Sequence, residues 1–279
     1  MRTFKKSKKI NAFLMKKQEA GMHIGFVPTM GALHEGHLSL IEQAKKYSDL
    51  VVCSIFVNPL QFNRKEDLVN YPKRIVEDTK LLEGAGCNCL FIPEVEEVYP
   101  QPPKIKFDFG SIGVGMEADY RPGHFNGVAA VIDRFFKILN PDFAFFGEKD
   151  FQQLAIVRWL VHSTHSATQI IPCNTKRYNS GLAMSSRNFR LNESELAIAA
   201  KIYQALSFAL ENKEILMPEE IISKCKSMLA IDFSVDYFQI ADENTMLPLK
   251  SWSDSNHPRA FVAAYLNGIR LIDNLSLID

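Results

Sequence analysis

Apolar runs typical of buried strands alternate with runs of helical period over the first two thirds of the chain. The expected strands cover residues 23–30, 49–58, 87–93, 142–147 and 168–173, and the expected helices cover 37–48, 71–86, 127–140 and 151–162. Strict alternation of strand and helix predicts a Rossmann-like, doubly wound parallel sheet with helices on both faces, an α/β fold. Such sheets bind ligands beyond the carboxyl ends of their strands, where the strand order reverses.

The pattern changes after about residue 176. A helix is expected over 192–212, with Asn192 as its N-cap and Glu195 three residues later, and a second helix over 218–230. Three strands are expected at 235–240, 259–266 and 269–278, with turn residues between them. We therefore expect an α/β domain over residues 1–176 and a smaller α+β C-terminal domain over residues 177–279.

Charge and composition narrow the class of protein. Lys+Arg and Asp+Glu both total 32, so no global basic field attracts nucleic acid or an acidic membrane, and any anion site must be local. The basic start lacks an apolar signal region, and the apolar run 51–57 is too short to cross a bilayer, so a soluble, cytoplasmic protein is expected.

The cysteines indicate reduced, buried thiols rather than disulfides. They are odd in number, lack CxxC spacing, and lie mostly in apolar runs: Cys53, Cys87, Cys89, Cys173 and Cys225. The closest pair, Cys87 and Cys89, is too tightly spaced for a structural zinc site.

The segment 25–41, GFVPTMGALHEGHLSLI, places His34 and His37 three residues apart. The expected strand ends near Met30 and the next helix begins a few residues later, so both imidazoles fall at a helix N-terminus, with Gly31 and Gly36 permitting close backbone approach. On pattern alone, phosphate binding and simple capping or surface histidines both remain open. A zinc site is less favoured because HEGH lacks the HExxH spacing, and neither a Walker loop nor GxGxxG is present.

The same segment resembles the HxGH signature of the nucleotidylyl-transferase superfamily. Six further blocks, at 54–62, 71–78, 121–128, 145–154, 181–188 and 270–274, resemble in the same order those of the pantothenate synthetase (pantoate–beta-alanine ligase) family. That family condenses pantoate with beta-alanine in pantothenate and coenzyme A biosynthesis, using ATP and Mg²⁺ and releasing AMP and pyrophosphate through a pantoyl adenylate. The resemblance implies the same reaction here, and a homodimer.

The resemblance also implies roles for individual residues. It makes His34, His37, Lys149 and Arg187 catalytic, and assigns contacts with ATP to Met30, His37, Gly147, Lys149, Asp150, Lys176, Met184, Ser185, Ser186 and Arg187. It assigns pantoate to Asn58, Gln61 and Gln153, and an indirect contact with Mg²⁺ to Asp78, possibly with Glu77. Arg121 and His124 are expected to face the second substrate or the intermediate. Taken singly, these residues also suit helix caps, surface groups or core, and Ser185 to Asn188 alone would favour a helix cap or a turn.

One segment departs from the family pattern. Residues 175–182, TKRYNSGL, keep Arg177 but lack the acidic residue that usually precedes the Gly-Leu pair. We expect the adenine contact near Lys176 to come from backbone, so a side-chain change there need not abolish ATP binding. Two other functions are alternatives: a transfer in which the product keeps the nucleotide, and a non-catalytic nucleotide sensor. Gln61 with Gln153, and the FVNPLQF run, argue against the first. A sensor would have lost Lys149, His34 or His37, and all three are present. A tRNA synthetase is disfavoured because no basic domain is appended.

Overall fold

The computed structural model describes residues 1–62, 68–69, 71–101, 103 and 106–278. Contacts divide the chain into two compact units. Unit 1 comprises Met1–Phe109, Arg121–Glu148 and Gln153–Asn174, and unit 2 comprises Gly110–Tyr120, Lys149–Gln152 and Thr175–Asp279. Two short segments from within the expected first domain therefore group with the C-terminal residues.

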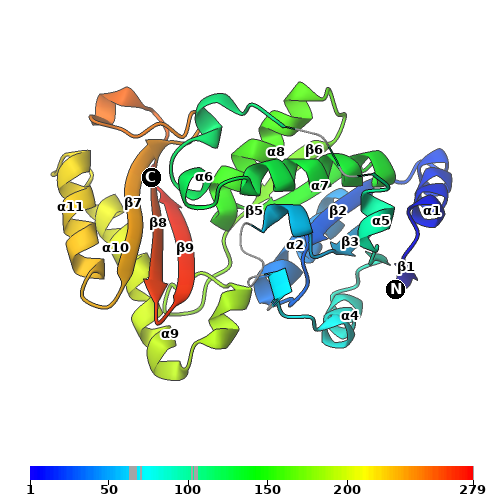
Figure 1. The fold of residues 1–279 in the computed structure, drawn as a ribbon, viewed down its shortest axis with the longest axis horizontal. Helices are drawn as coiled ribbons and strands as arrows, with labels where there is room; N and C mark the ends of the chain where they lie inside the picture. Colours follow the sequence, from blue (N-terminus) through cyan, green and yellow to red (C-terminus); the bar gives the residue numbers. More distant parts are fainter. Residues whose placement is uncertain (63–67, 70, 102, 104–105, 279) are drawn as a thin grey trace. The chain divides into compact units, whose positions relative to one another are not determined.

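The strands of unit 1 form a parallel sheet, six-stranded among the described residues. They are β1 (Arg2–Phe4), β2 (Ile24–Thr29), β3 (Leu50–Ile55), β4 (Cys89–Phe91), β5 (Phe143–Gly147) and β6 (Gln169–Cys173), in the spatial order β1-β4-β3-β2-β5-β6 (Figure 1). From β2 the chain builds outward through β3 and β4, and then returns to place β5 on the other side of β2. The order reverses between β2 and β5, so a ligand site is expected at their carboxyl ends.

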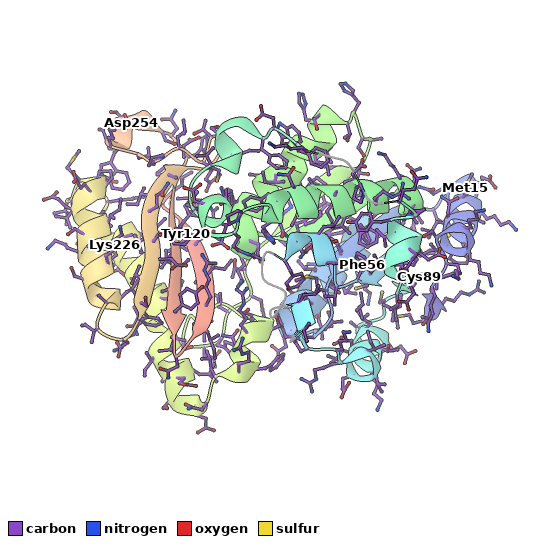
Figure 2. The ribbon with its side chains drawn as sticks, in the orientation of Figure 1. Met15, Phe56, Cys89, Tyr120, Lys226 and Asp254 are labelled. Carbon is purple, nitrogen blue, oxygen red and sulfur yellow. The ribbon has the colours of Figure 1, made fainter. Side chains whose placement is uncertain are left out.

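Helices cover both faces of this sheet, as the alternating pattern predicts. They are α1 (Ser7–Glu19), α2 (Glu35–Tyr47), α4 (Ile75–Gly84), α5 (Val95–Val98), α7 (His124–Leu139) and α8 (Phe151–Ser163). Successive strand residues point to opposite faces, so Val27 joins the core beside Ile41 of α2, while Phe26 packs edge-on against Phe135 of α7 at 5.5 Å. Phe56, which lies just after β3 and is labelled in Figure 2, packs on the same Phe135 ring, with the ring centroids 5.8 Å apart.

Two elements at the start of the chain were not anticipated from the sequence. Strand β1 pairs with β4, and α1 follows it with Ile10 and Leu14 fully buried. These two residues are one helical turn apart, but the many lysines around them make the helical period of apolar residues difficult to recognise in the sequence.

Unit 2 holds an antiparallel sheet of β7 (Ser234–Asp242), β8 (Pro258–Leu266) and β9 (Ile269–Ser276), in that order. Its helices are α6 (Glu117–Tyr120), α9 (Glu193–Ala199), α10 (Lys201–Asn212) and α11 (Pro218–Leu229). The capping box is confirmed, since Asn192 Oδ1 accepts from the Glu195 amide at 2.9 Å and Glu195 accepts from the Asn192 amide at 2.8 Å. The single helix expected over 192–212 is divided at Ala200. The expected α/β sheet with a smaller α+β part is confirmed.

All five cysteines are free and buried, as predicted. Burial raises the pKa of Cys89, at the start of β4, to about 12 (Figure 2). None of the helices in the described ranges combines the length and apolar character needed to span a bilayer.

Candidate active site

The loop that leaves β2 turns sharply before α2. Gly31 and Ala32 both have left-handed backbone, with φ of +84° and +50°. The carboxylate of Asp78, on α4, accepts a hydrogen bond from the Ala32 amide at 2.9 Å and another from the Leu33 amide at 2.8 Å. A Cβ atom at Gly31 would lie 3.0 Å from Asp78 Oδ2, so glycine is needed where the carboxylate approaches the loop. Asp78 thereby fixes the path of the chain into α2.

His34 and His37 lie at the N-terminus of α2 with their ring centroids 4.1 Å apart. Nδ1 of His34 accepts from the Gly36 amide at 3.1 Å, and Nδ1 of His37 accepts from the His34 amide at 3.4 Å. A ring nitrogen that accepts carries no proton, so each neutral imidazole has its hydrogen on Nε2 and can donate from that atom. Capping and anion binding, which the sequence left as alternatives, are therefore compatible, because each uses a different ring nitrogen.

A hydrogen-bonded amide cluster follows β3, at the same edge of the sheet. Asn58 is 1% exposed, and its Nδ2 donates to Gln61 Oε1 at 3.1 Å and to the Gly127 carbonyl at 2.9 Å. Gln61, in the short helix Pro59–Gln61, donates from Nε2 to the Met30 sulfur at 2.8 Å. The structure thus brings Met30, Asn58 and Gln61 together, and Asn58 holds the Gln61 amide in one orientation.

Helix α7 packs against the backbone of this cluster. Nδ1 of His124 lies 2.8 Å from the Gln61 carbonyl oxygen, and His124 is 5% exposed. A Cβ atom at Gly127 would lie 2.3 Å from the Leu60 carbonyl oxygen, so only glycine lets α7 approach this backbone so closely. The structure gives His124 a supporting contact with Gln61. The expected contact with the second substrate, for it and for half-buried Arg121, stays a prediction.

The carboxyl end of β5 carries the segment Gly147–Asp150. No described atom lies within 4 Å of a Cβ built on Gly147, so this position opens onto free space. Two residues on, Lys149 Nζ lies 3.8 Å from Asp150 Oδ2, with side-chain exposures of 16% and 46%. Gln153 lies in the first turn of α8 and is half-buried. Sequence reasoning therefore placed Gly147, Lys149 and Asp150 correctly at a strand end.

The MSSRN segment of unit 2 forms a short capped turn. Ser185 Oγ accepts from the Arg187 amide at 3.2 Å, and Arg187 donates from its guanidinium to the Arg270 carbonyl at 3.2 Å. Met184 donates its amide to the Lys176 carbonyl at 2.9 Å, while the Lys176 side chain is exposed. Ser186 begins the helix Ser186–Arg190 and is half-buried.

Arg177, which residues 175–182 keep from the family pattern, is held within unit 2. Arg177 makes a bidentate pair with Asp273 of β9, at 2.6 and 3.0 Å, and donates to the Gly181 carbonyl at 3.1 Å. Its guanidinium lies 4.5 Å from the Tyr203 ring centroid. An acid from a distant strand therefore holds this arginine, a contact that no local pattern in the sequence indicates.

Asp78 does not offer a direct magnesium site. It is 1% exposed and both of its oxygens already accept backbone amides, while neighbouring Glu77 is exposed. Across the residues that the structure describes, no three His, Cys, Asp or Glu side chains group so as to hold a metal ion. The contact expected for Asp78 can only be indirect, and it stays a prediction.

Comparison with known proteins decides the family. The family profile described as pantoate-beta-alanine ligase matches residues 2–276. The chain belongs to the pantoate-beta-alanine ligase family. Pantothenate synthetase of Porphyromonas gingivalis strain W83 is 42% identical over 281 residues, covering 100% of both chains, and that of Cytophaga hutchinsonii is 44% identical over 271 residues, covering 95% of each.

Solved structures agree with this membership. The pantothenate synthetase of Thermus thermophilus matches with a TM-score of 0.92 and 38% identity over 100% of both chains. The pantoate-beta-alanine ligase of Francisella tularensis, solved in complex with beta-gamma ATP and beta-alanine, matches with a TM-score of 0.81 and 35% identity over 99% and 98% of the chains. The predicted resemblance and the predicted activity, joining pantoate to beta-alanine, are confirmed by membership of the pantoate-beta-alanine ligase family.

Proposed function

We propose that this chain joins pantoate to beta-alanine in two steps, with ATP as co-substrate, and that the residues described above divide the work as follows. A pantoate carboxylate oxygen attacks the α-phosphorus of ATP, and pyrophosphate leaves with the electrons of the broken P–O bond. The beta-alanine amine then attacks the acyl carbon of pantoyl adenylate, AMP leaves, and the nitrogen loses a proton. Activation is needed because a free carboxylate is anionic and has no good leaving group.

The first step brings two anions together, so its catalysis depends on positioned hydrogen-bond donors and positive charge. His34 and His37 donate from Nε2 to phosphate oxygens, a role supported by the backbone amides that occupy both Nδ1 atoms. The N-terminus of α2 adds its positive dipole end. Lys149 and Arg187 supply full positive charge to the phosphates.

The remaining contacts with ATP follow the chemistry of each group. The free space at Gly147 suits the ribose, and the half-exposed carboxylate of Asp150 suits its hydroxyl groups. Backbone near Lys176 and the Met184 side chain contact the adenine, and Ser185 and Ser186 donate to the phosphates.

Pantoate binds through neutral amides, which can donate to and accept from its hydroxyl and carboxylate groups. Gln61 and Gln153 make these contacts, and Met30 supplies an apolar surface beside them. Asn58, almost fully buried, contributes by holding the Gln61 amide in place. Water is excluded as the 181–188 segment closes over the ligands, which protects the adenylate from hydrolysis.

Magnesium, the oligomeric state and the cellular location are finer proposals. Mg²⁺ enters bound to ATP and neutralises phosphate charge; no residue of the described chain is assigned as its direct ligand. A homodimer and a cytoplasmic location follow from the family resemblance, and sedimentation analysis of the purified protein tests the first.

The reaction rests on the family match over residues 2–276, and the assignment of the histidines rests on the pairing of their rings at the start of α2. Pantoate alone, without beta-alanine, should drive exchange of labelled pyrophosphate into ATP, since adenylate formation is reversible. Absence of exchange at saturating ATP and Mg²⁺ would refute the two-step reaction.

Variants test the residues separately from the reaction. His37→Ala and Lys149→Ala should each slow the exchange by about 100-fold, the usual loss for one charge-stabilising donor. His162→Ala and Lys226→Ala remove exposed side chains of the same types and should leave the rate unchanged. Wild-type exchange in His37→Ala and Lys149→Ala would overturn the proposed site while leaving the reaction intact.

A further inference from the structure

The RLIDN block, residues 270–274, has no role in the reaction described above, although it is one of the blocks that resemble the family. It lies in β9, at the edge of the three-stranded sheet of unit 2 (Figure 1). Its polar residues Arg270, Asp273 and Asn274 each contact a different segment of unit 2. One of those segments carries Lys149.

Asn274 contacts this segment directly. The residue is 3% exposed; its Nδ2 donates to the Lys149 carbonyl oxygen at 2.9 Å, and its Oδ1 accepts from the Arg259 guanidinium at 2.6 Å. A guanidinium only donates, so the Asn274 oxygen must face Arg259 and the amide group must face Lys149. Arg259 is itself held, by Glu243 at 2.7 Å and over the Phe151 ring at 4.0 Å. The orientation of the Asn274 donor is therefore fixed.

The same strand fixes the neighbours of the Lys149 segment. Arg270 lies 2.7 Å from Glu117 and 2.8 Å from Asp236. The Glu117 amide donates to Gln152 Oε1 at 3.0 Å, which ties the short segment Lys149–Gln152 to Gly110–Tyr120. Tyr120, labelled in Figure 2, joins α6 to β7, because its hydroxyl donates to the Asp236 carbonyl. Both ends of the Lys149 segment are thus held to β9, one directly and one through Gln152 and Glu117.

Asp273, next to Asn274 on the same strand, is almost fully buried and pairs with Arg177. Burial raises the pKa of the Asp273 carboxyl, while the hydrogen bonds from Arg177 and the charge of Lys149 act in the opposite direction.

We propose that Asn274 is a positioning residue for the ligase reaction: its amide holds the Lys149 backbone so that the ammonium is already in place when ATP binds. The proposal rests on the role of Lys149 given under the proposed function. Positioning of this kind matters because an error of about 1 Å in a reacting group costs about 100-fold in rate.

Asn274→Asp is the sharpest variant. It keeps the shape and the acceptor for Arg259, removes the donor to the Lys149 carbonyl, and places a carboxylate oxygen opposite that carbonyl oxygen, which repels it. We expect pantoate-driven pyrophosphate exchange to slow by about 10- to 100-fold, mostly in kcat. Asn212→Ala is the matched control, because Asn212 Nδ2 also donates to a backbone carbonyl, that of Phe208 at 2.8 Å, within α10. Asn212→Ala should lower the stability of the protein, but the rate of pyrophosphate exchange per folded molecule should stay at the wild-type value.

A double-mutant cycle with Lys149→Ala separates positioning from general damage. If Asn274 acts through the lysine, Asn274→Asp should cause little further loss in the Lys149→Ala background, whereas multiplicative losses would overturn the proposal. If Lys149→Ala alone has wild-type exchange, the role assigned to Lys149 has failed instead. Hydrogen exchange of peptides that cover residues 147–152 gives a readout without activity. Hydrogen exchange of these peptides should accelerate in Asn274→Asp and not in Asn212→Ala. Unchanged hydrogen exchange in Asn274→Asp would also overturn the proposal.

Discussion

Replacing Asp78 by Asn tests how the paired histidines are held. The carboxylate accepts the buried amides of Ala32 and Leu33, at 2.9 and 2.8 Å, and Asp78 is 1% exposed. The variant keeps one acceptor and turns an NH₂ group toward the other amide, which is left unpaired. Hydrogen bonds to charged groups contribute about 1.5–3 kcal/mol, and an unsatisfied buried donor costs about 1–3 kcal/mol. We expect the free energy of unfolding to fall by about 2–3 kcal/mol, measured by urea denaturation.

The same variant should slow pantoate-driven pyrophosphate exchange, because the loop it loosens leads directly into His34. Excess Mg²⁺ should not restore the rate if Asp78 acts by holding the loop. Glu77→Gln, which alters the exposed neighbouring carboxylate, serves as the control and should match the wild type in both assays. Unchanged stability in Asp78→Asn, together with activity recovered at high Mg²⁺, would refute the structural role and support a role for Asp78 in retaining the metal.

Three further predictions follow from close approach, open space and burial, and a fourth follows from the proposed need for Mg²⁺. Gly127→Ala should destabilise the protein by about 1–3 kcal/mol and raise KM for pantoate, because its Cβ would lie 2.3 Å from the Leu60 carbonyl oxygen. Denaturation and kinetic assays measure the two effects, with Gly84→Ala as the control, because no atom lies within 4 Å of a Cβ at Gly84. Gly147→Ala should leave stability within about 0.5 kcal/mol of wild type but raise KM for ATP, since its Cβ would enter ligand space; an unchanged KM would contradict this. Iodoacetamide at pH 8 should leave the native thiols unmodified for minutes and label five after denaturation, counted by mass spectrometry, because burial raises the pKa values of the cysteines, to about 11 for Cys87. EDTA should abolish exchange, and Mg²⁺ should restore it, without a change in circular dichroism.

The sequence predicted those features that depend on local pattern. The position of His34 and His37 at the start of α2 follows from a strand, a glycine turn and a helix in direct succession. The capping box at Asn192 follows from residue types three apart. Both are confirmed because neighbours in sequence determine them.

Features that depend on distant contacts could not be predicted in this way. Asp78 was assigned near the metal from its place in a family block, and its contact with the Ala32 amide joins residues 46 apart. The bond from Asn274 to the Lys149 carbonyl spans 125 residues. Periodicity gives which face of an element is apolar, but it does not give which polar side chain on one element meets which backbone group on another.

The anchoring of Arg177 by β9 also frees the residues beside it for engineering. Tyr178, Asn179 and Ser180 are exposed in a turn whose position the Arg177–Asp273 pair already secures. Every native thiol is buried, so a cysteine introduced at Asn179 would be the one accessible sulfhydryl on the part of the chain described here. A fluorophore attached there would lie a few residues ahead of the serines of the MSSRN segment. On the role proposed for these serines, we expect its emission to change when a nucleotide binds.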